Sequence, residues 1–296
     1  MLPEGFRSRL HSIATDRKSG AIELAIDVVG AFEVLERERY LPSKEELGAA
    51  ASFLAKAQPS MVSIRNTADI CQRILSGGGN EEANLAAIRK FLRESRSKVS
   101  ANALGLFPPN ATCITISRSS TVISALRLAA RSGALRRLYV MESRPRLEGR
   151  STAREIAAEG IECILVVDAA GPTLAREADL AVVGADSVLT DGAIVNKTGT
   201  FALSTSFKFA RKPVYVLSES IKLNRQYNSE TWPGSELRDE REILPKPPKG
   251  LRALNRYFDV SPAANVRAVV HERGVSRRGW VGAMEKVLRD LHEAVA

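Results

Sequence analysis

The spacing of apolar residues changes near residue 105 and divides the 296-residue chain into two parts. In the first part, apolar positions recur every three or four residues, which is the spacing of amphipathic helices. Clusters of glycine, proline and serine interrupt this pattern. The pattern predicts four helices, over residues 21–35, 44–57, 62–75 and 81–94. We therefore expect residues 1–105 to form a helical domain.

The second part alternates short β-branched runs with amphipathic stretches. Such alternation is typical of a parallel sheet with helices on its faces. The predicted strands are 112–116, 138–141, 163–167, 180–183 and 214–217, and the predicted helices are 122–131, 151–159, 200–209 and 281–295. The predicted fold class is α/β, with an N-terminal helical domain followed by a Rossmann-like parallel-sheet domain over residues 106–296.

One stretch, residues 224–250, departs from this alternation. It is polar and contains four prolines. Proline has no backbone N–H group, so it fits poorly in a central strand or a helix interior. We expect this stretch to be an ordered excursion from the second domain or an arm that contacts a partner.

Composition argues against several classes of protein. The formal charge is +9, but the basic residues are spread along the chain and aromatic residues make up only 5%. This argues against a nucleic-acid partner, which needs a basic patch or stacking platforms. No apolar run approaches the roughly 18 residues that cross a bilayer, and the N-terminus lacks a secretory pattern. We expect a cytoplasmic protein with no membrane partner.

The sequence also predicts neither a metal nor a cofactor. The cysteines, Cys71, Cys113 and Cys163, are far apart and odd in number, so they fit neither a disulfide framework nor a zinc site. The three histidines lack metal-ligand spacing. No Gly-x-Gly-x-x-Gly run follows a predicted strand, which argues against a dinucleotide cofactor.

Polar residues follow the predicted strands, at residues 117–120, 142–144, 168, 186 and 218–219. Ligands of open α/β sheets bind beyond the carboxyl ends of the strands. Asp186 follows the strand that ends at Val183, and Asn196 and Lys197 come after a turn at 191–192. A carboxylate, an amide and an ammonium group at one edge can bind a small phosphorylated substrate and move a proton on it.

Two predicted helix starts are candidate anion sites. Ser119 and Ser120 precede the helix at 122, with Arg118 beside them. Hydroxyl groups, free backbone N–H groups and a guanidinium group bind anions, although a plain N-cap has the same sequence and both interpretations stay open. Residues 198–200, next to Lys197, open another helix. Two anion sites on either side of Asp186 would suit a sugar that carries two phosphates.

Together these runs resemble a known family, which contains the α, β and δ subunits of translation initiation factor 2B, methylthioribose-1-phosphate isomerase and archaeal ribose-1,5-bisphosphate isomerase. The resemblance covers nearly the whole chain. The matching runs are 19–21, 59–60, 142–145 with Gly149, 184–186, 196–200, 213–220 with Lys222, and 258–262.

The resemblance implies a helical domain, a Rossmann-like domain and dimerisation through the latter. The isomerases of the family pair a cysteine with an aspartate and interconvert an aldose 1-phosphate and a ketose 1-phosphate. Asp186 occupies the aspartate position. The remaining matches are Asn196, Lys197 and Lys222 at substrate-holding positions, and Ser19, Gly20 and Ala21 at the N-terminal phosphate loop, with Lys18 beside them.

The chain departs from the family pattern at three positions. Ser19 replaces the arginine usual before Gly20, and Arg17 and Lys18 are close enough to compensate. Ser117 stands where the isomerases carry the cysteine, and a serine hydroxyl is far less acidic than a thiol with a pKa of about 8.5. Cys113 lies four residues earlier, about 13 Å away along a strand, which is too far to substitute. Gln58 replaces the arginine expected before Pro59, and we expect Arg65 to supply that charge.

Two functions follow from this resemblance. The first is an aldose–ketose isomerase of a phosphorylated pentose, in which Asp186 moves a proton, Ser117 orients a hydroxyl group, and Asn196 and Lys197 hold the developing enediolate oxygen. Phosphate would bind to Lys18, Arg118, Ser119 and Ser120. The second is a non-catalytic sugar-phosphate-binding regulatory protein that resembles the α subunit of initiation factor 2B. Both predict a phosphorylated sugar as ligand and a homo-oligomer, either a dimer or a multiple of dimers.

Overall fold

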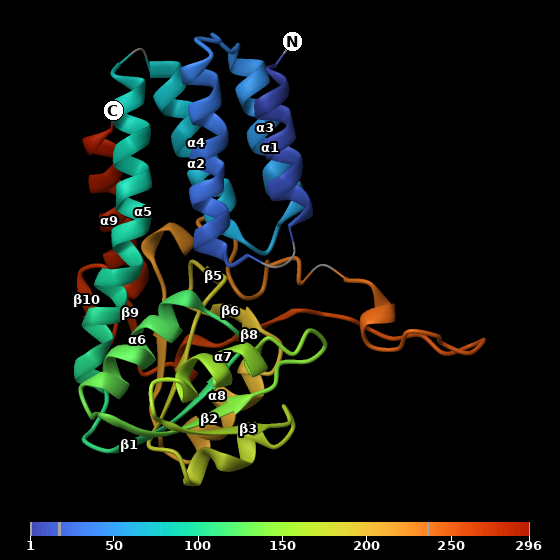
Figure 1. Cartoon of the computed structure of the whole chain (residues 1–296), viewed down its shortest axis with the longest axis vertical. Coiled ribbons are helices and arrows are strands. Elements are labelled where there is room, and N and C mark those ends of the chain that lie inside the picture. Colours follow the sequence, from blue (N-terminus) through green and yellow to red (C-terminus); the bar gives the residue numbers. More distant parts are fainter. Residues whose placement is uncertain (1, 17–18, 78, 236, 296) are drawn as a thin grey trace.

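The computed structural model describes residues 2–16, 19–77, 79–235 and 237–295. Its N-terminal part consists of helices that stand side by side above a sheet (Figure 1). These are α1 (Glu4–Thr15), α2 (Ala21–Arg37), α3 (Lys44–Ala57), α4 (Val62–Gly77) and α5 (Glu81–Ala103). The four predicted helices are present, and α5 continues past the predicted end because Val99 and Ala103 extend its buried stripe.

The second part contains a seven-stranded sheet with the order β10-β9-β7-β4-β1-β2-β3. All neighbouring strands are parallel except β10, which pairs antiparallel with β9. The predicted α/β fold class, a helical part followed by a mostly parallel sheet, is confirmed. The strands are β1 (Ala111–Ile116), β2 (Leu135–Met141), β3 (Glu162–Val166), β4 (Leu180–Val183), β7 (Val214–Leu217), β9 (Ala268–His271) and β10 (Gly274–Ser276).

Helices cover both faces of this sheet because the inner strands are apolar on both sides. On β4, Leu180 and Val182 pack into one apolar cluster, whereas Ala181 and Val183 pack into another. Helices α6 (Ser120–Arg131) and α7 (Gly149–Ala157) contribute to the first cluster, and α8 (Thr200–Phe209) contributes to the second. Parallel sheets buried on both faces give such continuous apolar strands.

The order of the strands places a switch point between β1 and β4. From β1 the chain continues to β2 and β3 on one side, and it then crosses to β4 and β7 on the other. In open α/β sheets a crevice forms at such a point, beyond the carboxyl ends of the strands. The sequence therefore positions the residues after Ile116 and after Val183 next to each other.

A small antiparallel sheet, which the sequence did not predict, lies next to this edge. It consists of β5 (Ser187–Val188), β6 (Ile194–Lys197) and β8 (Phe258–Ser261), in the order β5-β6-β8. Asn196 and Lys197, which were expected in a loop before a helix, are the last residues of β6 and pair with Asp259 and Phe258. Short 3-10 helices complete the chain: η1 (Leu104–Leu106), η2 (Gly171–Arg176), η3 (Ser220–Lys222), η4 (Glu240–Glu242) and η5 (Ala263–Asn265).

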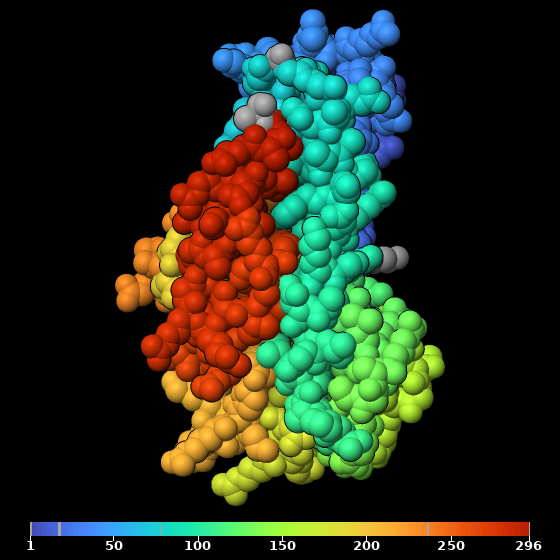
Figure 2. All heavy atoms as spheres, turned by 90° about the vertical axis from the view of Figure 1, so that its left-hand side faces the viewer, coloured from blue at the N-terminus to red at the C-terminus, as the bar shows by residue number. Residues whose placement is uncertain are grey.

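The last helix, α9 (Trp280–Ala294), returns to the helical part. It runs beside α5 in both views, and the side-chain amide of Asn84 donates a hydrogen bond to the Val295 carbonyl oxygen at 3.2 Å (Figures 1 and 2). Met284, Leu288 and Leu291 belong to the same apolar cluster as the N-terminal helices. Within the described ranges, the model has no helix with the length and apolar character needed to span a bilayer.

Candidate functional site

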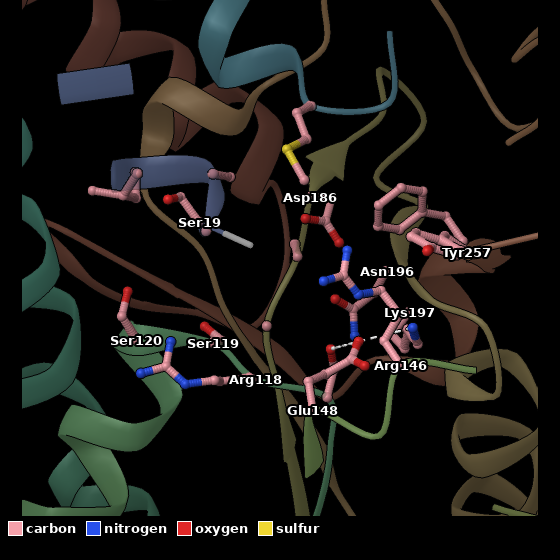
Figure 3. A pocket seen from close by; sticks show the side chains of 18 of the residues that line it. Ser19, Arg118, Ser119, Ser120, Arg146, Glu148, Asp186, Asn196, Lys197 and Tyr257 are labelled. Carbon is pink, nitrogen blue, oxygen red and sulfur yellow. Dashed lines mark hydrogen bonds and ion pairs between the residues drawn. The ribbon is translucent and has the colours of Figure 1, made fainter. Parts of the chain in front are cut away.

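A cavity of about 340 Å³ lies between the helical part and the carboxyl edge of the sheet. Its walls come from segments that are far apart in the chain: the turn before α2, the residues after β1 and β4, the segment before α7, the end of β6, and η3 (Figure 3). The lining includes most of the predicted site residues: Ser19, Gly20, Ala21, Ser117, Arg118, Ser119, Ser120, Asp186, Asn196, Lys197 and Lys222. Arg17 and Lys18 lie outside the described residues.

Asp186 enters the cavity from the segment after β4. Its backbone N–H donates to the Val195 carbonyl oxygen at 2.9 Å, which attaches the segment to β6. Two residues earlier, Gly184 lies against Ser119, and a Cβ atom at this glycine would be 3.0 Å from both the Cβ and the Oγ of Ser119. The absence of a side chain at Gly184 therefore lets the start of α6 approach Asp186.

The start of α6 forms one wall. Ser119 is its N-cap, and the Ser119 Oγ accepts a 3.4 Å hydrogen bond from the Val122 N–H. Arg118 forms an ion pair with Glu155 at 3.0 Å and remains partly exposed. Ser119 thus caps α6 and also lines the cavity, so the N-cap interpretation and the anion-site interpretation of residues 118–120 are compatible.

The start of α2 forms the opposite wall. Gly20 is the N-cap of this 17-residue helix and offers no capping side chain. Ser19 is turned toward Asp16, whose carboxylate accepts hydrogen bonds from the Ser19 N–H at 2.9 Å and from the Ser19 Oγ at 2.8 Å. The first N–H groups of a long helix attract anions, so α2 and α6 direct two partial positive charges at one cavity.

The start of α8 does not provide the anion site that residues 198–200 suggested. The Asp259 carboxylate occupies this helix start and accepts hydrogen bonds from the Gly199 N–H at 2.6 Å and the Phe201 N–H at 3.1 Å. Burial raises the pKa of Asp259 to about 6, although both N–H groups act in the opposite direction. A carboxylate therefore closes the start of α8, whereas the starts of α2 and α6 both line the cavity.

Lys197 lies deep in the cavity beside Glu148. Its Nζ is 2.8 Å from the Glu148 Oε1 and 4.8 Å from the centroid of the Tyr257 ring. The Ser117 Oγ donates to the same Glu148 oxygen at 3.2 Å. Ser117, Glu148 and Lys197 thus form a continuous polar chain along one wall.

Lys222 is also paired, but with a carboxylate outside the cavity lining. Its Nζ is 2.9 Å from the Glu219 Oε2, and both side chains are almost fully buried. Burial alone would lower the pKa of Lys222, but the charges of Glu219 and Asp186 raise it above its usual value. Burial likewise opposes ionisation of Glu219, yet Lys222 and Thr121 hold its pKa below the usual range. The pair is therefore ionised at neutral pH.

Arg65 and Cys113 do not lie in the cavity lining. Arg65 forms a hydrogen bond with Gln226 and lines a neighbouring hollow of about 220 Å³. Cys113 is buried within β1, and this burial raises the pKa of its thiol. Gln58 does line the cavity, where its Nε2 donates to the Asp16 carbonyl oxygen at 2.8 Å. It thus holds the turn before α2 without supplying a charge.

Sequence reasoning missed several residues of this site. Glu148, Arg146, Tyr257 and Arg238 line the cavity together with the predicted residues. Arg146 and Glu148 lie between two parts of the family-like pattern, residues 142–145 and Gly149, but they are not part of that pattern themselves. Asp168, a predicted strand-end group, instead accepts hydrogen bonds from the Ser143 and Arg144 N–H groups, both at 2.7 Å.

Comparison with known proteins establishes the family. A family model described as the initiation factor 2 subunit family matches residues 17–278. The chain belongs to this family. It is 31% identical over 280 residues to a putative translation initiation factor eIF-2B subunit 2-like protein of Pyrococcus furiosus, covering 93% of this chain and 97% of the relative. It is 30% identical over 238 residues to the ribose 1,5-bisphosphate isomerase of Archaeoglobus fulgidus, covering 78% of this chain and 76% of the relative.

Solved structures agree with this membership. The chain is similar to the Pyrococcus horikoshii translation initiation factor eIF-2B, with a TM-score of 0.80, 28% identity and coverage of 94% of this chain and 99% of the other. The 5-methylthioribose 1-phosphate isomerase of the same organism shares the fold, with a TM-score of 0.73 at 19% identity, over 98% of this chain and 88% of the other. The family therefore includes both sugar-phosphate isomerases and initiation-factor-like proteins.

Proposed function

We propose that this protein is an aldose–ketose isomerase that acts on a phosphorylated pentose such as ribose 1,5-bisphosphate. One observation carries the proposal: a single cavity contains the Asp186 carboxylate together with the starts of two helices, α2 and α6. The helix starts would bind the two phosphates of the substrate. The sugar carbons between them would then lie beside Asp186.

Asp186 acts as the acid–base group on carbon. Its carboxylate removes the proton from C2 while the bond between C1 and the ring oxygen breaks and a double bond forms between C1 and C2; the resulting carboxylic acid then returns that proton to C1. In this second step the hydroxyl on C2 loses its proton, and its oxygen carries the developing negative charge of the enolate before it becomes the ketone. The Lys197 ammonium group and the Asn196 amide hold that oxygen.

A second function is favoured by one specific observation. Ser117 occupies the position of the family cysteine, and its hydroxyl is bonded to Glu148 at 3.2 Å. A protein that had kept the phosphate-binding walls and lost the reaction would be a sugar-phosphate-binding regulator. The two functions share the ligand and differ in turnover, so one set of measurements separates them.

We also propose that the protein forms a homodimer, or a multiple of dimers, through its α/β part. Phe201 and Phe209 on α8 are 47% and 84% exposed, and Val167 at the end of the edge strand β3 is 58% exposed. A subunit interface on this part would remove these apolar side chains from water. Light scattering should give at least twice the 32.2 kDa mass of the chain, and the variant Phe209→Asp should lower it.

Carbon-13 NMR of the sugar tests the isomerase directly. Ribose 1,5-bisphosphate, 5-methylthioribose 1-phosphate and ribose 5-phosphate are each incubated with the protein, and the ketone carbon signal of the product is followed. We expect turnover of at least one of them. Asp186→Asn should lower this turnover by 10²–10⁴-fold, the usual contribution of one acid–base group.

Thermal unfolding with the same sugars measures binding separately. A ligand at 100 times its dissociation constant stabilises the folded state by about 2.7 kcal/mol. Asp191→Asn is the matched control, because Asp191 accepts a hydrogen bond from the Ser229 N–H at 3.0 Å outside the cavity lining. Stabilisation without turnover would support the regulator, and neither stabilisation nor turnover would refute both functions.

A further inference from the structure

Ser117 is held in an unusual backbone conformation at the end of β1. Its φ angle is +70°, in the left-handed region that costs energy for a residue other than glycine. Its N–H donates to the Ser143 Oγ at 2.7 Å, and its carbonyl oxygen accepts from the Thr152 Oγ1 at 3.0 Å. The backbone is thus fixed on both sides, and the strain places the Ser117 hydroxyl in the cavity.

Glu148 receives that hydroxyl group. Its Oε1 is shared by the Ser117 Oγ at 3.2 Å and the Lys197 Nζ at 2.8 Å. Its Oε2 is buried and has no hydrogen-bond partner among the described residues. A buried oxygen without a partner costs about 1–3 kcal/mol, and a hydroxyl group of a bound sugar would remove this cost.

We propose that Glu148 is a second catalytic acid–base residue, which works through Ser117 on the oxygens of the sugar while Asp186 works on its carbons. This inference rests on the proposed isomerase function. A serine hydroxyl is too weak an acid to replace a thiol alone, but a serine bonded to a carboxylate can pass a proton in either direction. The pair would thereby perform the proton transfer that Ser117 alone cannot.

The proton balance of the reaction requires such a group. When the ring opens, the bond between C1 and the ring oxygen breaks and the ring oxygen gains a proton. When the ketone forms, the hydroxyl on C2 loses a proton. Asp186 moves only the proton that travels from C2 to C1. A second group that gives a proton to the ring oxygen, and then takes the proton of the C2 hydroxyl, returns to its starting state after each turnover.

Asp16 and Glu23 also line the cavity. The Asp16 carboxylate accepts hydrogen bonds from Ser19, and the Glu23 Oε1 forms an ion pair with Arg96 at 3.2 Å, while the Glu23 Oε2 is buried without a hydrogen-bond partner among the described residues, as the Glu148 Oε2 is. Glu148 contacts both Ser117 and Lys197, whereas Asp16 and Glu23 belong to the turn before α2 and to α2 itself. Among these three acids, Glu148 is therefore the one placed to exchange a proton at the Ser117 hydroxyl.

The variants Glu148→Gln, Ser117→Ala and their combination test the inference. Glutamine keeps the size of the side chain and an oxygen that can accept from Ser117, but it cannot carry the proton. We expect kcat to fall by 10²–10⁴-fold in Glu148→Gln, while the dissociation constant of the sugar changes by less than threefold. One limb of the dependence of kcat on pH should disappear. The double variant should be no more than about threefold slower than the slower single variant, because residues that act as a unit are non-additive.

Glu142→Gln is the matched control. Glu142 is six residues away, forms an ion pair with Arg150 at 3.1 Å and is not part of the cavity lining. Its variant should keep kcat within threefold. If wild-type protein turns over a sugar but Glu148→Gln retains more than a third of kcat, or the double variant loses the product of the two single effects, the inference alone is overturned. If wild-type protein turns over none of the sugars, the proposed function fails and this inference fails with it.

Discussion

The cavity has two lysines paired with glutamates, and the two pairs differ in how completely they are enclosed. Lys222 and Glu219 have 5% and 0% of their side chains exposed, whereas Lys197 and Glu148 have 4% and 24% exposed. Glu219 has a further partner in Thr121, so its carboxylate is fully engaged within the protein. The carboxylate of Glu148 reaches the cavity. We infer that the first pair maintains the structure of the site and that the second takes part in its chemistry.

The largest expected effect on stability comes from Glu219→Gln. This change leaves the Lys222 ammonium group buried without its anion, and breaking a buried pair in this way costs about 3–5 kcal/mol. Urea denaturation followed by circular dichroism measures the loss. Glu148→Gln should cost less than about 1 kcal/mol in the same assay. Equal losses for the two variants would mean that the two pairs have the same structural role.

A third carboxylate, Asp259, sharpens the comparison because backbone N–H groups of Gly199 and Phe201, rather than a lysine, donate hydrogen bonds to it. Burial raises its pKa to about 6 in the folded protein, above the unfolded value of about 3.9. Between about pH 4 and pH 6, the Asp259 carboxyl group is therefore largely protonated in the folded state and largely ionised in the unfolded state. Its contribution to stability is present below about pH 4 and declines as the pH rises to about 6, by up to about 3 kcal/mol.

Asp259→Asn should remove this part of the pH dependence. Free energies of unfolding at pH 4, 5, 6 and 7 for the variant and the wild-type protein provide the test. The difference between the two should change across this range and become constant above pH 6. A constant difference over all four values would contradict the raised pKa.

The smallest expected effect concerns the approach of α6 to Asp186. In Gly184→Ala, the new Cβ atom would lie 3.0 Å from the Ser119 side chain, so Ser119 must shift by a few tenths of an ångström. We expect the dissociation constant of the sugar phosphate to rise about tenfold, which corresponds to about 1.4 kcal/mol. Titration calorimetry measures this change. Gly282→Ala is the control, because a Cβ atom at this position in α9 meets no atom within 4 Å.

Most of the secondary structure could be predicted from the sequence. The strands 180–183 and 214–217 and the helix 200–209 have the predicted bounds, because apolar periodicity and turn residues act locally. Strand β6 was missed since it has only four residues and two of them, Asn196 and Lys197, are polar. A strand this short takes its structure from β5 and β8, and β8 lies about sixty residues later in the chain.

Part of the site could also be predicted from the sequence. The residues after β1 and β4 could be placed together, because strand ends at one edge follow from a parallel sheet. The closed start of α8 could not be foreseen, because its carboxylate comes from Asp259, 58 residues from Phe201. Glu148 was missed because its role depends on a contact with Lys197, 49 positions away, and nothing local marks it as special.

The position of α9 has a consequence for how the chain is made. Met284, Leu288 and Leu291 share an apolar cluster with residues of the N-terminal helices, yet the ribosome adds them after the whole seven-stranded sheet. Until then the earlier helices leave part of their apolar surface uncovered, and exposed surface of this kind favours aggregation. A nascent chain of this protein thus completes its first apolar cluster only after α9 has emerged from the ribosome.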